Sequence, residues 1–530
     1  MQRKDWYLGL PVVLAFGVSA IALQPGEARA QANELKIAVS TFATETLDAV
    51  DGGVGSFSYQ LPLYDHLVTL NTRRQMVPGL AESWTVTPDG KIYTFKLRRG
   101  VKFHNGDDFS AADVINHFTV RLPKSKQGIF ASEIAGLTES MQAPDPMTVV
   151  WTLKKADADF FGKLTPSDTT IGGITPKKAT DDLGTEKFAD MPIGTGPFKI
   201  VDRKKGASMH FDRVTAHAYR PVPKFEKLRI SRIPEEATRV AMLQRGEADI
   251  GEVDVEAAKT VVGHGGQVFE IPNAYVAFIS FIGAWEQKAK DNKVPAADVR
   301  VRKALAMAIN RQELLDIMLD KRGQLINAFL TFQGGLGYDE AWEKANGTAF
   351  DPAGAKRLLA EAGYPNGFKQ KLWAMPLAGA PWFPKATEVI ADYWRAIGVE
   401  VTFQQTDFGA LGPQIYSRAE GALGDAYNLR TGRTDFAIGK LNNYMTTDGR
   451  NKVANINWNT EWNAANDVLD PKAREAAFQK LARDFRETYT LIPLFNTGAL
   501  YGARRDIEGW EPTQGWPNIS MRYEYLGRRS

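Results

Sequence analysis

The chain of 530 residues contains no cysteine, which excludes disulfide bonds and thiolate metal sites. It also excludes a lipid-modified N-terminal cysteine, the usual tether of exported proteins in bacteria without an outer membrane. Histidine is scarce: the six copies include no pair spaced four residues apart, so neither a zinc site of that kind nor another cofactor is expected. The 65 basic and 62 acidic residues nearly balance, which gives no reason to expect nucleic acid as a partner.

Long apolar runs are missing after the first 30 residues. Residues 8–23 form a mostly apolar stretch interrupted by Pro11, which is shorter than the roughly 20 residues needed to span a bilayer. A short basic start precedes this stretch, and Ala28-Arg29-Ala30 follows it with a small-x-small cleavage pattern. We predict a secretory signal peptide over residues 1–30; the alternative is an uncleaved membrane anchor.

Catalytic motifs are also missing from the mature chain. It has no His-Glu-x-x-His zinc pair, no Gly-x-Ser-x-Gly elbow and no cysteine nucleophile. The glycine-rich bend at residues 193–198 is not followed by Gly-Lys-Ser/Thr, and Pro197 removes a backbone donor, so a phosphate loop is excluded. Carboxylates are plentiful, and their spacing alone leaves a glycosidase pair open.

Residues 78–114 form a continuous block that predicts a β-hairpin, a polar turn and a capped helix. Apolar and polar residues alternate over 84–86 and 93–97, as in half-buried strands. Pro88-Asp89-Gly90 stands between them and suits a tight turn, because proline presets φ and Asp-Gly tolerates the left-handed conformation. Ser110 then fits a helix N-cap. Nothing here resembles catalytic machinery, so the block is expected to be scaffold.

Strands and helices alternate along the rest of the mature chain, which indicates an α/β fold. We expect strands over residues 34–39, 148–153, 198–201, 275–282, 371–374 and 399–403. We expect helices over residues 237–245, 299–315, 352–362 and 387–397. Asp351 and Pro352 mark one helix start, with aspartate as N-cap and proline at the first helical position.

The opening block resembles the signature segment of extracellular solute-binding proteins of the oligopeptide and dipeptide type, which feed ABC importers. Later segments resemble the same family in its order, and together they cover nearly the whole mature chain. These are IGTGPFK (193–199), LQRGEADI (243–250), VRVRKALAMAINRQELL (299–315), DPAGAKRLLAEAGYPNG (351–367), LWAMP (372–376) and IPLF (492–495).

This resemblance implies the two-lobe periplasmic-binding-protein fold, an α/β fold with a hinge and an extra subdomain inserted in the first lobe. On that basis the first lobe comprises residues 31–75, 212–297 and 503–530, the inserted subdomain residues 76–211, and the second lobe residues 298–502. The ligand is enclosed between the lobes, and closure presents a surface to a membrane permease.

Both of the family's residues for binding the charged ends of a dipeptide are missing. In the dipeptide-binding members, an arginine that holds the peptide carboxylate follows the LWAMP-like segment. Here Ala380 stands about there, followed by Trp382 at an aromatic position. Further on, those members carry an aspartate that pairs with the α-amine, and Arg430 falls about at its place. Asp435 matches a different aspartate of that loop, and residues 432–435 give the Gly-Arg-x-Asp sequence of other members.

A buried charge without a partner is destabilising by several kcal/mol, so Arg430 should disfavour a free peptide N-terminus. Our hypothesis is that Arg430 or Arg433 binds an anionic or strongly polar ligand group through bidentate hydrogen bonds. The alternative is that these arginines form structural salt bridges, for example to Asp435 or Asp425.

Aromatic residues are candidates for the walls of the ligand site, because such sites combine apolar surface with a few polar anchors. The candidates are Trp382, Phe408, Tyr427 and Trp458. In the first lobe, Phe42 and the loop 51–56 with Gly53 fall where the family contacts ligand, and glycine permits close backbone approach. The alternatives are ordinary core packing for the aromatic residues and a plain flexible turn for the loop.

The function expected from these observations is ligand capture for import, without enzymatic activity. The partners are a small-molecule or peptide ligand and an inner-membrane ABC permease with its ATPase, and the protein acts as a monomer. An exported chain without a lipid tether needs a compartment that retains it, which points to the periplasm of a Gram-negative bacterium. The alternatives are a periplasmic glycosidase-type hydrolase and a peptide-holding chaperone.

The signal-peptide assignment makes the first testable prediction. We expect the mature chain to begin at Gln31, because cleavage follows the small-x-small pattern. N-terminal sequencing of exported protein measures this directly. A mature chain that retains residues 8–23 would support the membrane anchor instead.

Overall fold

The computed structural model describes residues 33–73, 75–125, 129–157, 160–166, 170–328, 335–432, 444–446, 456–468, 470–511 and 522–529. Its strands and helices confirm the α/β class that the sequence pattern predicts. Among the helices within these ranges, none is long and apolar enough to cross a membrane.

The main structural element of the molecule is a single sheet of eleven strands. The strand order is β15-β14-β16-β12-β17-β11-β1-β10-β9-β8, and β13 pairs with β17 outside this path. The strands are β1 (Glu34–Val39), β8 (Phe198–Lys204), β9 (Ser208–Arg213), β10 (Lys227–Arg232), β11 (Ile250–Val253), β12 (Gln267–Phe281), β13 (Gln324–Leu325), β14 (Lys369–Ala374), β15 (Glu400–Gln405), β16 (Ala426–Gly432) and β17 (Leu491–Ala503).

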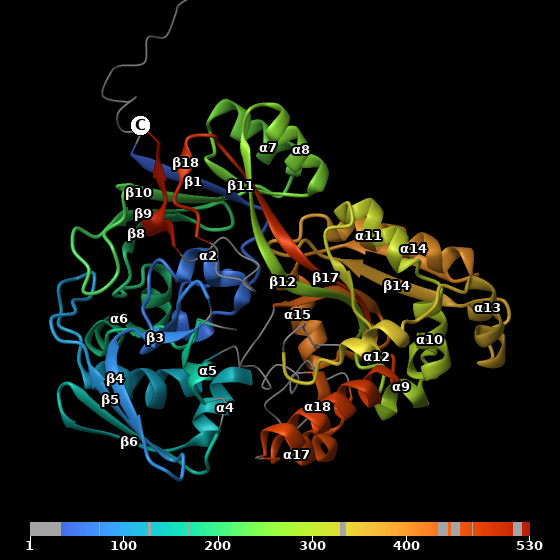
Figure 1. Cartoon of the computed structure of the whole chain (residues 1–530), viewed down its shortest axis with the longest axis horizontal. Helices are drawn as coiled ribbons and strands as arrows, with labels where there is room; N and C mark the ends of the chain where they lie inside the picture. The colour runs from blue at the N-terminus through green and yellow to red at the C-terminus, as the bar shows by residue number, and fades with distance from the viewer. Residues whose placement is uncertain are drawn as a thin grey trace, which may run out of the picture.

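Two long strands, β12 and β17, join the two lobes (Figure 1). The first part of β12 pairs with the end of β17, which in turn pairs with β11 of the first lobe. The second part of β12 pairs with β16 of the second lobe. The register of β12 against β17 shifts between Ile271 and Tyr275, where Asn273 has a φ of 48°. A second shift lies between Ala277 and Phe278, and such shifts bend a strand locally.

The block 78–114 folds largely as its residues predict. Strands β4 (Ala81–Val86) and β5 (Ile92–Leu97) form the hairpin, and Gly90 donates its N–H to the Thr87 carbonyl at 2.8 Å with a φ of 69°. Ser110 and Asp113 form a capping box at the start of α3 (Ala111–Asn116). The hairpin belongs to a separate antiparallel sheet, β4-β5-β7-β6, with β6 (Thr138–Asp145) and β7 (Thr148–Leu153).

Aromatic packing holds this smaller sheet against its helices. The Trp151 side chain is fully buried and lies edge-on to Phe160 at a centroid distance of 4.9 Å, with Phe118 at 4.7 Å on another side. Figure 1 shows the four strands at the lower left, below the main sheet. The packing gives this part of the chain its own hydrophobic core.

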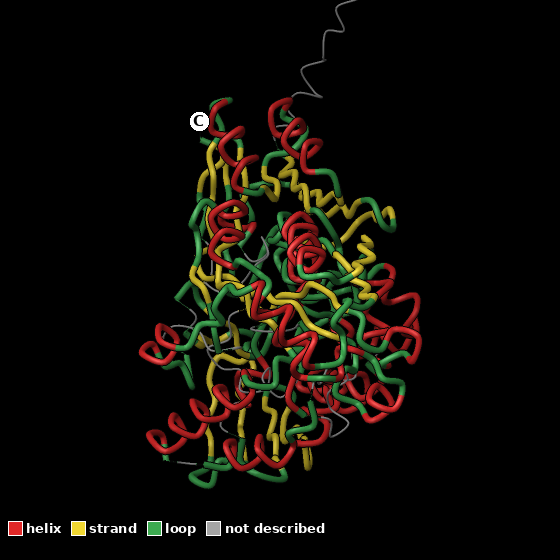
Figure 2. The backbone as a smooth tube through the Cα atoms, turned by 90° about the vertical axis from the view of Figure 1, so that its right-hand side faces the viewer, coloured by secondary structure: helices red, strands yellow, loops and turns green. Residues whose placement is uncertain are grey.

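Helices pack around the strands in both lobes, and Figure 2, which faces the second lobe, shows them in red beside the yellow strands. In the first lobe and the smaller sheet they are α2 (Phe57–Gln60), α4 (Ile129–Leu137), α5 (Phe160–Leu164), α6 (Lys177–Asp190), α7 (Glu236–Arg245) and α8 (Val255–Gly263). In the second lobe and its approach they are α9 (Gln287–Asp291), α10 (Val299–Met307), α11 (Arg311–Leu319), α12 (Glu340–Ala345), α13 (Pro352–Glu361), α14 (Phe383–Ala396), α15 (Phe408–Ser417), α17 (Asn459–Asn466) and α18 (Pro471–Arg486).

The prediction of one helix over residues 299–315 is wrong, because two helices, α10 and α11, occupy this stretch. Asn310 starts α11 by accepting the Glu313 N–H with its side-chain oxygen, and such local bonding favours a cap over a continuous helix. The helix predicted over 387–397 starts earlier, at Phe383, with a proline in its first turn. The start at Pro352 is confirmed, since the Asp351 side chain accepts the Gly354 N–H at 2.7 Å.

Two buried histidines lie where the smaller sheet meets the first lobe. His117 is fully buried, with Nε2 2.6 Å from the Ile171 carbonyl oxygen and Nδ1 3.2 Å from the Thr175 hydroxyl. Burial lowers the pKa of His117 to about 3 and that of His66 to about 4. Both side chains are therefore neutral in the folded protein at neutral pH.

The low pKa values of His66 and His117 predict that the free energy of unfolding falls as the pH falls below neutrality. Between pH 7 and pH 5 the unfolded chain takes up protons on these groups and the folded chain does not, so each histidine removes about 2 kcal/mol from the free energy of unfolding. The substitution His117→Gln should make this loss smaller by about the same amount. Urea unfolding at each pH measures it, with His264→Gln as the control on an exposed histidine. Equal slopes in the His117 variant and the parent would contradict the prediction.

Candidate functional site

The candidate site begins at the carboxyl ends of two parallel strands of the first lobe. β1 and β11 are parallel neighbours, and ligands of open α/β sheets bind outside such strand ends. Ser40 directly follows β1, and Glu252 lies on β11 with 1% of its surface exposed. One Glu252 carboxylate oxygen accepts hydrogen bonds from the Ser40 backbone N–H at 2.9 Å and from the Ser40 hydroxyl at 2.5 Å.

A chain of hydrogen bonds continues from Glu252 into the second lobe. The Gly379 N–H donates to the other Glu252 oxygen at 3.3 Å. The Gly379 carbonyl accepts from the Tyr275 hydroxyl at 3.0 Å, and the Trp382 indole N–H donates to that hydroxyl at 3.0 Å. Tyr275 is fully buried on β12, and burial raises its pKa, so the phenol stays protonated. The loop between β14 and α14 is thereby bound to both the hinge strand and the first lobe.

Arg430 lies beside this chain of hydrogen bonds. It stands on β16 opposite Ala277 of β12, and its guanidinium carbon lies 5.4 Å from the centre of the Tyr275 ring. Burial lowers the pKa of Arg430, while Tyr275, Tyr501 and Glu252 act in the opposite direction. A positive group of the second lobe and a buried carboxylate of the first lobe thus act on each other across the hinge.

Two of the sequence-predicted residues, Trp382 and Arg430, meet through Tyr275. Trp382 is 3% exposed and packs against Phe383 and Phe495, with ring centroids at 4.8 and 5.4 Å. Its indole ring is therefore packed among aromatic side chains of the second lobe, and its N–H orients the Tyr275 hydroxyl.

The other predicted residues lie elsewhere. Phe42 is 2% exposed and lies edge-on to Tyr59 at 5.6 Å. Tyr427 is fully buried on β16, opposite Ser280 of β12. A Cβ atom added to Gly53 would meet nothing within 4 Å, so this glycine borders open space.

Phe408 is the first residue of α15, and Trp458 is the N-cap of α17. Phe408 is half-buried and lies edge-on to Tyr416 at 6.1 Å, while Trp458 precedes α17 and lies edge-on to Phe485 at 5.8 Å. Arg433 and Asp435 lie outside the described residues. Asp425, one of the alternative partners for the arginines, instead accepts the Trp373 indole N–H at 2.9 Å and lies 3.5 Å from the Lys371 ammonium group.

Sequence reasoning missed Glu252 and Tyr275. Nothing in the sequence distinguishes Glu252 from the acidic residues around it, which are Glu247, Asp249, Asp254 and Glu256. Buried carboxylates require hydrogen-bonded partners, but the burial of Glu252 is visible only in the fold. Tyr275 carried no signal beyond its place in an apolar strand.

A second set of contacts joins the lobes beside this site. The Lys385 ammonium group on α14 lies 2.8 Å from the Asp254 carboxylate and 3.3 Å from that of Glu236. Asp254 caps α8 of the first lobe by accepting the Ala257 N–H at 2.8 Å. Among the described residues, no group of three or more His, Asp or Glu side chains is arranged to hold a metal ion.

Comparison of the amino-acid sequence with known proteins identifies the family of this chain. The chain matches the model of bacterial extracellular solute-binding proteins, family 5 Middle, over residues 75–477. Heme-binding protein A of Haemophilus influenzae is 31% identical over 357 residues, which is 62% of this chain and 62% of that protein, less than two thirds of its length. The dipeptide-binding protein of Pseudomonas aeruginosa is 26% identical over 462 residues, 82% of this chain and 84% of that protein.

The fold also matches solved structures. The structure of AgaA from A. tumefaciens R10 in complex with agropinic acid aligns with a TM-score of 0.78 at 23% identity, covering 94% of this chain and 99% of that chain. This likeness confirms the two-lobe α/β fold expected from the sequence.

The hydrogen bonds of the Tyr275 hydroxyl predict how its removal changes the free energy of unfolding. Tyr275→Phe leaves the buried Trp382 indole N–H and the Gly379 carbonyl without their partner, so the free energy of unfolding should fall by about 1–3 kcal/mol. Urea unfolding measures the loss. The control is Tyr416→Phe, whose phenol has no hydrogen bond to the described part of the chain. A loss no larger than that of the control would show that the Tyr275 hydroxyl does not hold the loop.

Proposed function

Because the chain belongs to the bacterial extracellular solute-binding proteins of family 5, we propose that it is the substrate-binding component of an ABC importer. It captures one ligand between its lobes, without enzymatic activity, and delivers it to an inner-membrane permease with its ATPase. The observation that carries the proposal is the pair of lobes joined by β12 and β17, with Glu252, Tyr275 and Arg430 gathered where they meet. The protein works as a monomer in the periplasm of a Gram-negative bacterium.

The proposed domain boundaries follow the same family pattern. The first lobe comprises residues 31–75, 212–297 and 503–530, the insertion residues 76–211, and the second lobe residues 298–502. The membership of β8 in the main sheet favours an insertion that ends before Phe198.

The ligand class must be inferred from the residues of the site, because proteins similar to this chain bind different ligands. The names of the similar proteins include heme, a dipeptide and agropinic acid. Ala380 is fully buried and forms a backbone bridge with Leu377, so this position offers no charged group for a peptide carboxylate. The positive group near Tyr275 is Arg430, whose planar guanidinium suits a bidentate contact with a carboxylate or phosphate.

We infer that the ligand is a short peptide or a peptide-like compound with an acidic group, such as an opine-like or sugar conjugate. Its acidic group would lie against Arg430 and its body against the wall that includes Trp382. Glu252 has a different role in this arrangement. Its carboxylate accepts hydrogen bonds from Ser40 and Gly379, and its negative charge repels any second acidic group of the ligand near the first lobe.

Closure of the lobes follows from contacts that need both of them. The Gly379 N–H reaches Glu252, and Lys385 reaches Asp254, only when the loop before α14 and the first lobe lie together. A ligand that contacts both lobes favours this arrangement over a more open one, and differential affinity of this kind shifts the population. The hinge motion therefore links ligand capture to the surface that a permease recognises.

Calorimetry on the mature protein tests the ligand class. Acidic conjugates of small peptides or amino acids should bind, and simple unmodified dipeptides should bind weakly. Arg430→Gln should weaken binding of the acidic ligand about ten- to a hundred-fold, because a charge-assisted hydrogen bond contributes about 1.5–3 kcal/mol. Arg395→Gln on α14 is the control, since its side chain pairs with Asp392 on the surface. Thermal unfolding checks that both variants fold.

The outcomes separate the alternative functions. Tight binding of an unmodified dipeptide, unchanged in the Arg430 variant, would reject the anionic ligand class. Hydrolysis of model sugars would support a glycosidase instead of a binding protein. Suppression of aggregation without saturation by a small ligand would support a chaperone, whereas saturable thermal stabilisation without turnover supports the proposal.

A further inference from the structure

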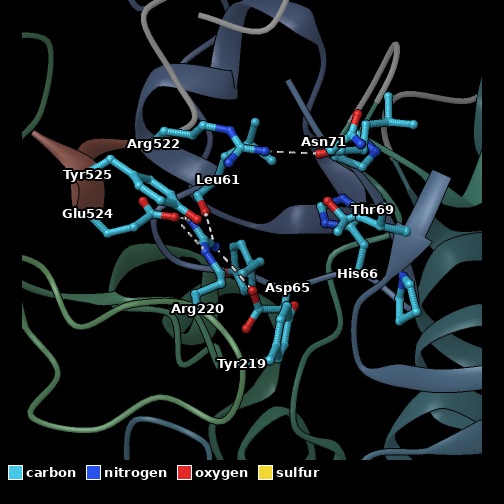
Figure 3. Close-up of a pocket in the computed structure, with 15 residues that line it drawn as sticks. Leu61, Asp65, His66, Thr69, Asn71, Tyr219, Arg220, Arg522, Glu524 and Tyr525 are labelled. Atoms are coloured by element: carbon cyan, nitrogen blue, oxygen red, sulfur yellow. Dashed lines mark hydrogen bonds and ion pairs between the residues drawn. The ribbon is translucent and has the colours of Figure 1, made fainter. Parts of the chain in front are cut away.

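A cavity of about 300 Å³ lies where the first lobe meets the inserted subdomain, apart from the residues at the hinge. It is formed by three stretches that are distant in the sequence, residues 61–78, 219–220 and 522–525, together with Pro166. Figure 3 shows their side chains converging on one space. Its volume is at the lower end of the range for small-molecule sites, about 300–1,000 Å³.

A charge network forms one side of this cavity. The Asp65 carboxylate lies 3.1 Å from Arg220 and 3.0 Å from the His217 imidazole, and Arg220 lies 2.9 Å from the Glu524 carboxylate. Burial would raise the pKa of Asp65, but His217 and Arg220 hold it well below its usual range. These groups pair with one another and form a rigid wall, in which the two carboxylates of Asp65 and Glu524 share the single guanidinium of Arg220.

Arg522 differs from the members of this network. Its guanidinium carbon lies 5.3 Å from the centre of the Tyr525 ring, and one N–H donates to the Leu70 carbonyl at 3.4 Å. Within the described residues no acidic side chain pairs with it. A guanidinium has five N–H donors, so most of them are available to a ligand. Figure 3 shows Arg522 across the cavity from Thr69 and the network below it.

His66 also lines the cavity. Its side chain is 2% exposed, and its Nε2 atom is itself buried and has no hydrogen-bond partner in the described part of the chain. A buried atom of this kind does not face the open space, so the donor that faces a ligand is the Arg522 guanidinium.

The rest of the lining limits the shape and charge of a ligand. Apolar side chains contribute much of the wall, and they are Leu61, Leu70, Val77, Pro78 and Pro166. The carboxylates of Asp65 and Glu524 also line the cavity, and like charges brought close together cost several kcal/mol. Because this repulsion grows with the charge of the ligand, it opposes a dianion such as phosphate more than a monoanion, and the apolar wall suits a ligand with an apolar body.

We propose that this cavity is a second ligand site, distinct from the one between the lobes, that binds a small monocarboxylate with an apolar body. The carboxylate accepts hydrogen bonds from Arg522, and the apolar body packs between Leu61 and Pro78. Its lining residues belong to the first lobe and the inserted subdomain and to no part of the second lobe, so occupancy does not require lobe closure.

Calorimetry on the mature chain with phenylacetate as the probe tests this proposal. Phenylacetate should bind saturably, and the uncharged phenylacetamide should bind at least ten-fold more weakly. Arg522→Gln should weaken phenylacetate binding at least ten-fold, whereas Arg522→Lys, which keeps the charge, should retain most of it. The matched control is Arg505→Gln, an exposed arginine of the same C-terminal region, which should leave the affinity unchanged.

The outcome is independent of the ligand proposed for the cleft. Arg430→Gln should leave phenylacetate binding unchanged, so failure of the cleft hypothesis does not affect this result. Absence of saturable binding, equal binding of the amide, or unchanged affinity in a folded Arg522→Gln variant would each overturn the second site. Loss of phenylacetate binding in the Arg430 variant would place the probe in the cleft and would also overturn it.

Discussion

The pairing of β12 with β17 is the constraint on which the rest of the molecule depends. β17 pairs with β11 of the first lobe at its end and with β13 of the second lobe nearer its start, while β12 pairs with β17 along its length and with β16 of the second lobe. The ladder between β12 and β17 is interrupted between Ile271 and Tyr275 and again between Ala277 and Phe278. The pairing of β12 with β16 brings Arg430 against Tyr275 beside these interruptions.

Buried charge is handled in two ways in this protein. Around Asp65 and around the pair formed by Asp48 and Arg121, each charge has a close partner of opposite sign, which suits rigid scaffold. At the pivot, the Glu252 carboxylate accepts hydrogen bonds from Ser40 of the first lobe and Gly379 of the second. The hydrogen bonds of Glu252 therefore depend on the position of the Gly379 loop relative to the first lobe.

The relatives show why the fold does not identify the cargo. The same architecture aligns with a protein in complex with agropinic acid, and the sequence aligns with heme-binding and dipeptide-binding proteins. Function of this kind lies in a few side chains placed on a shared scaffold.

The sequence alone determined the features whose cause is local. The turn at Pro88-Asp89-Gly90 and the caps at Ser110 and Asp351 follow from backbone preferences within four residues, and all three are present. The pattern missed the break between α10 and α11, where a side-chain cap overrides helical periodicity. Only the tertiary structure decided the site, because its hydrogen bonds from Gly379 to Glu252 and from Trp382 to Tyr275 join residues 127 and 107 positions apart. Such contacts depend on the register of β12 against β17, which periodicity along the chain does not encode.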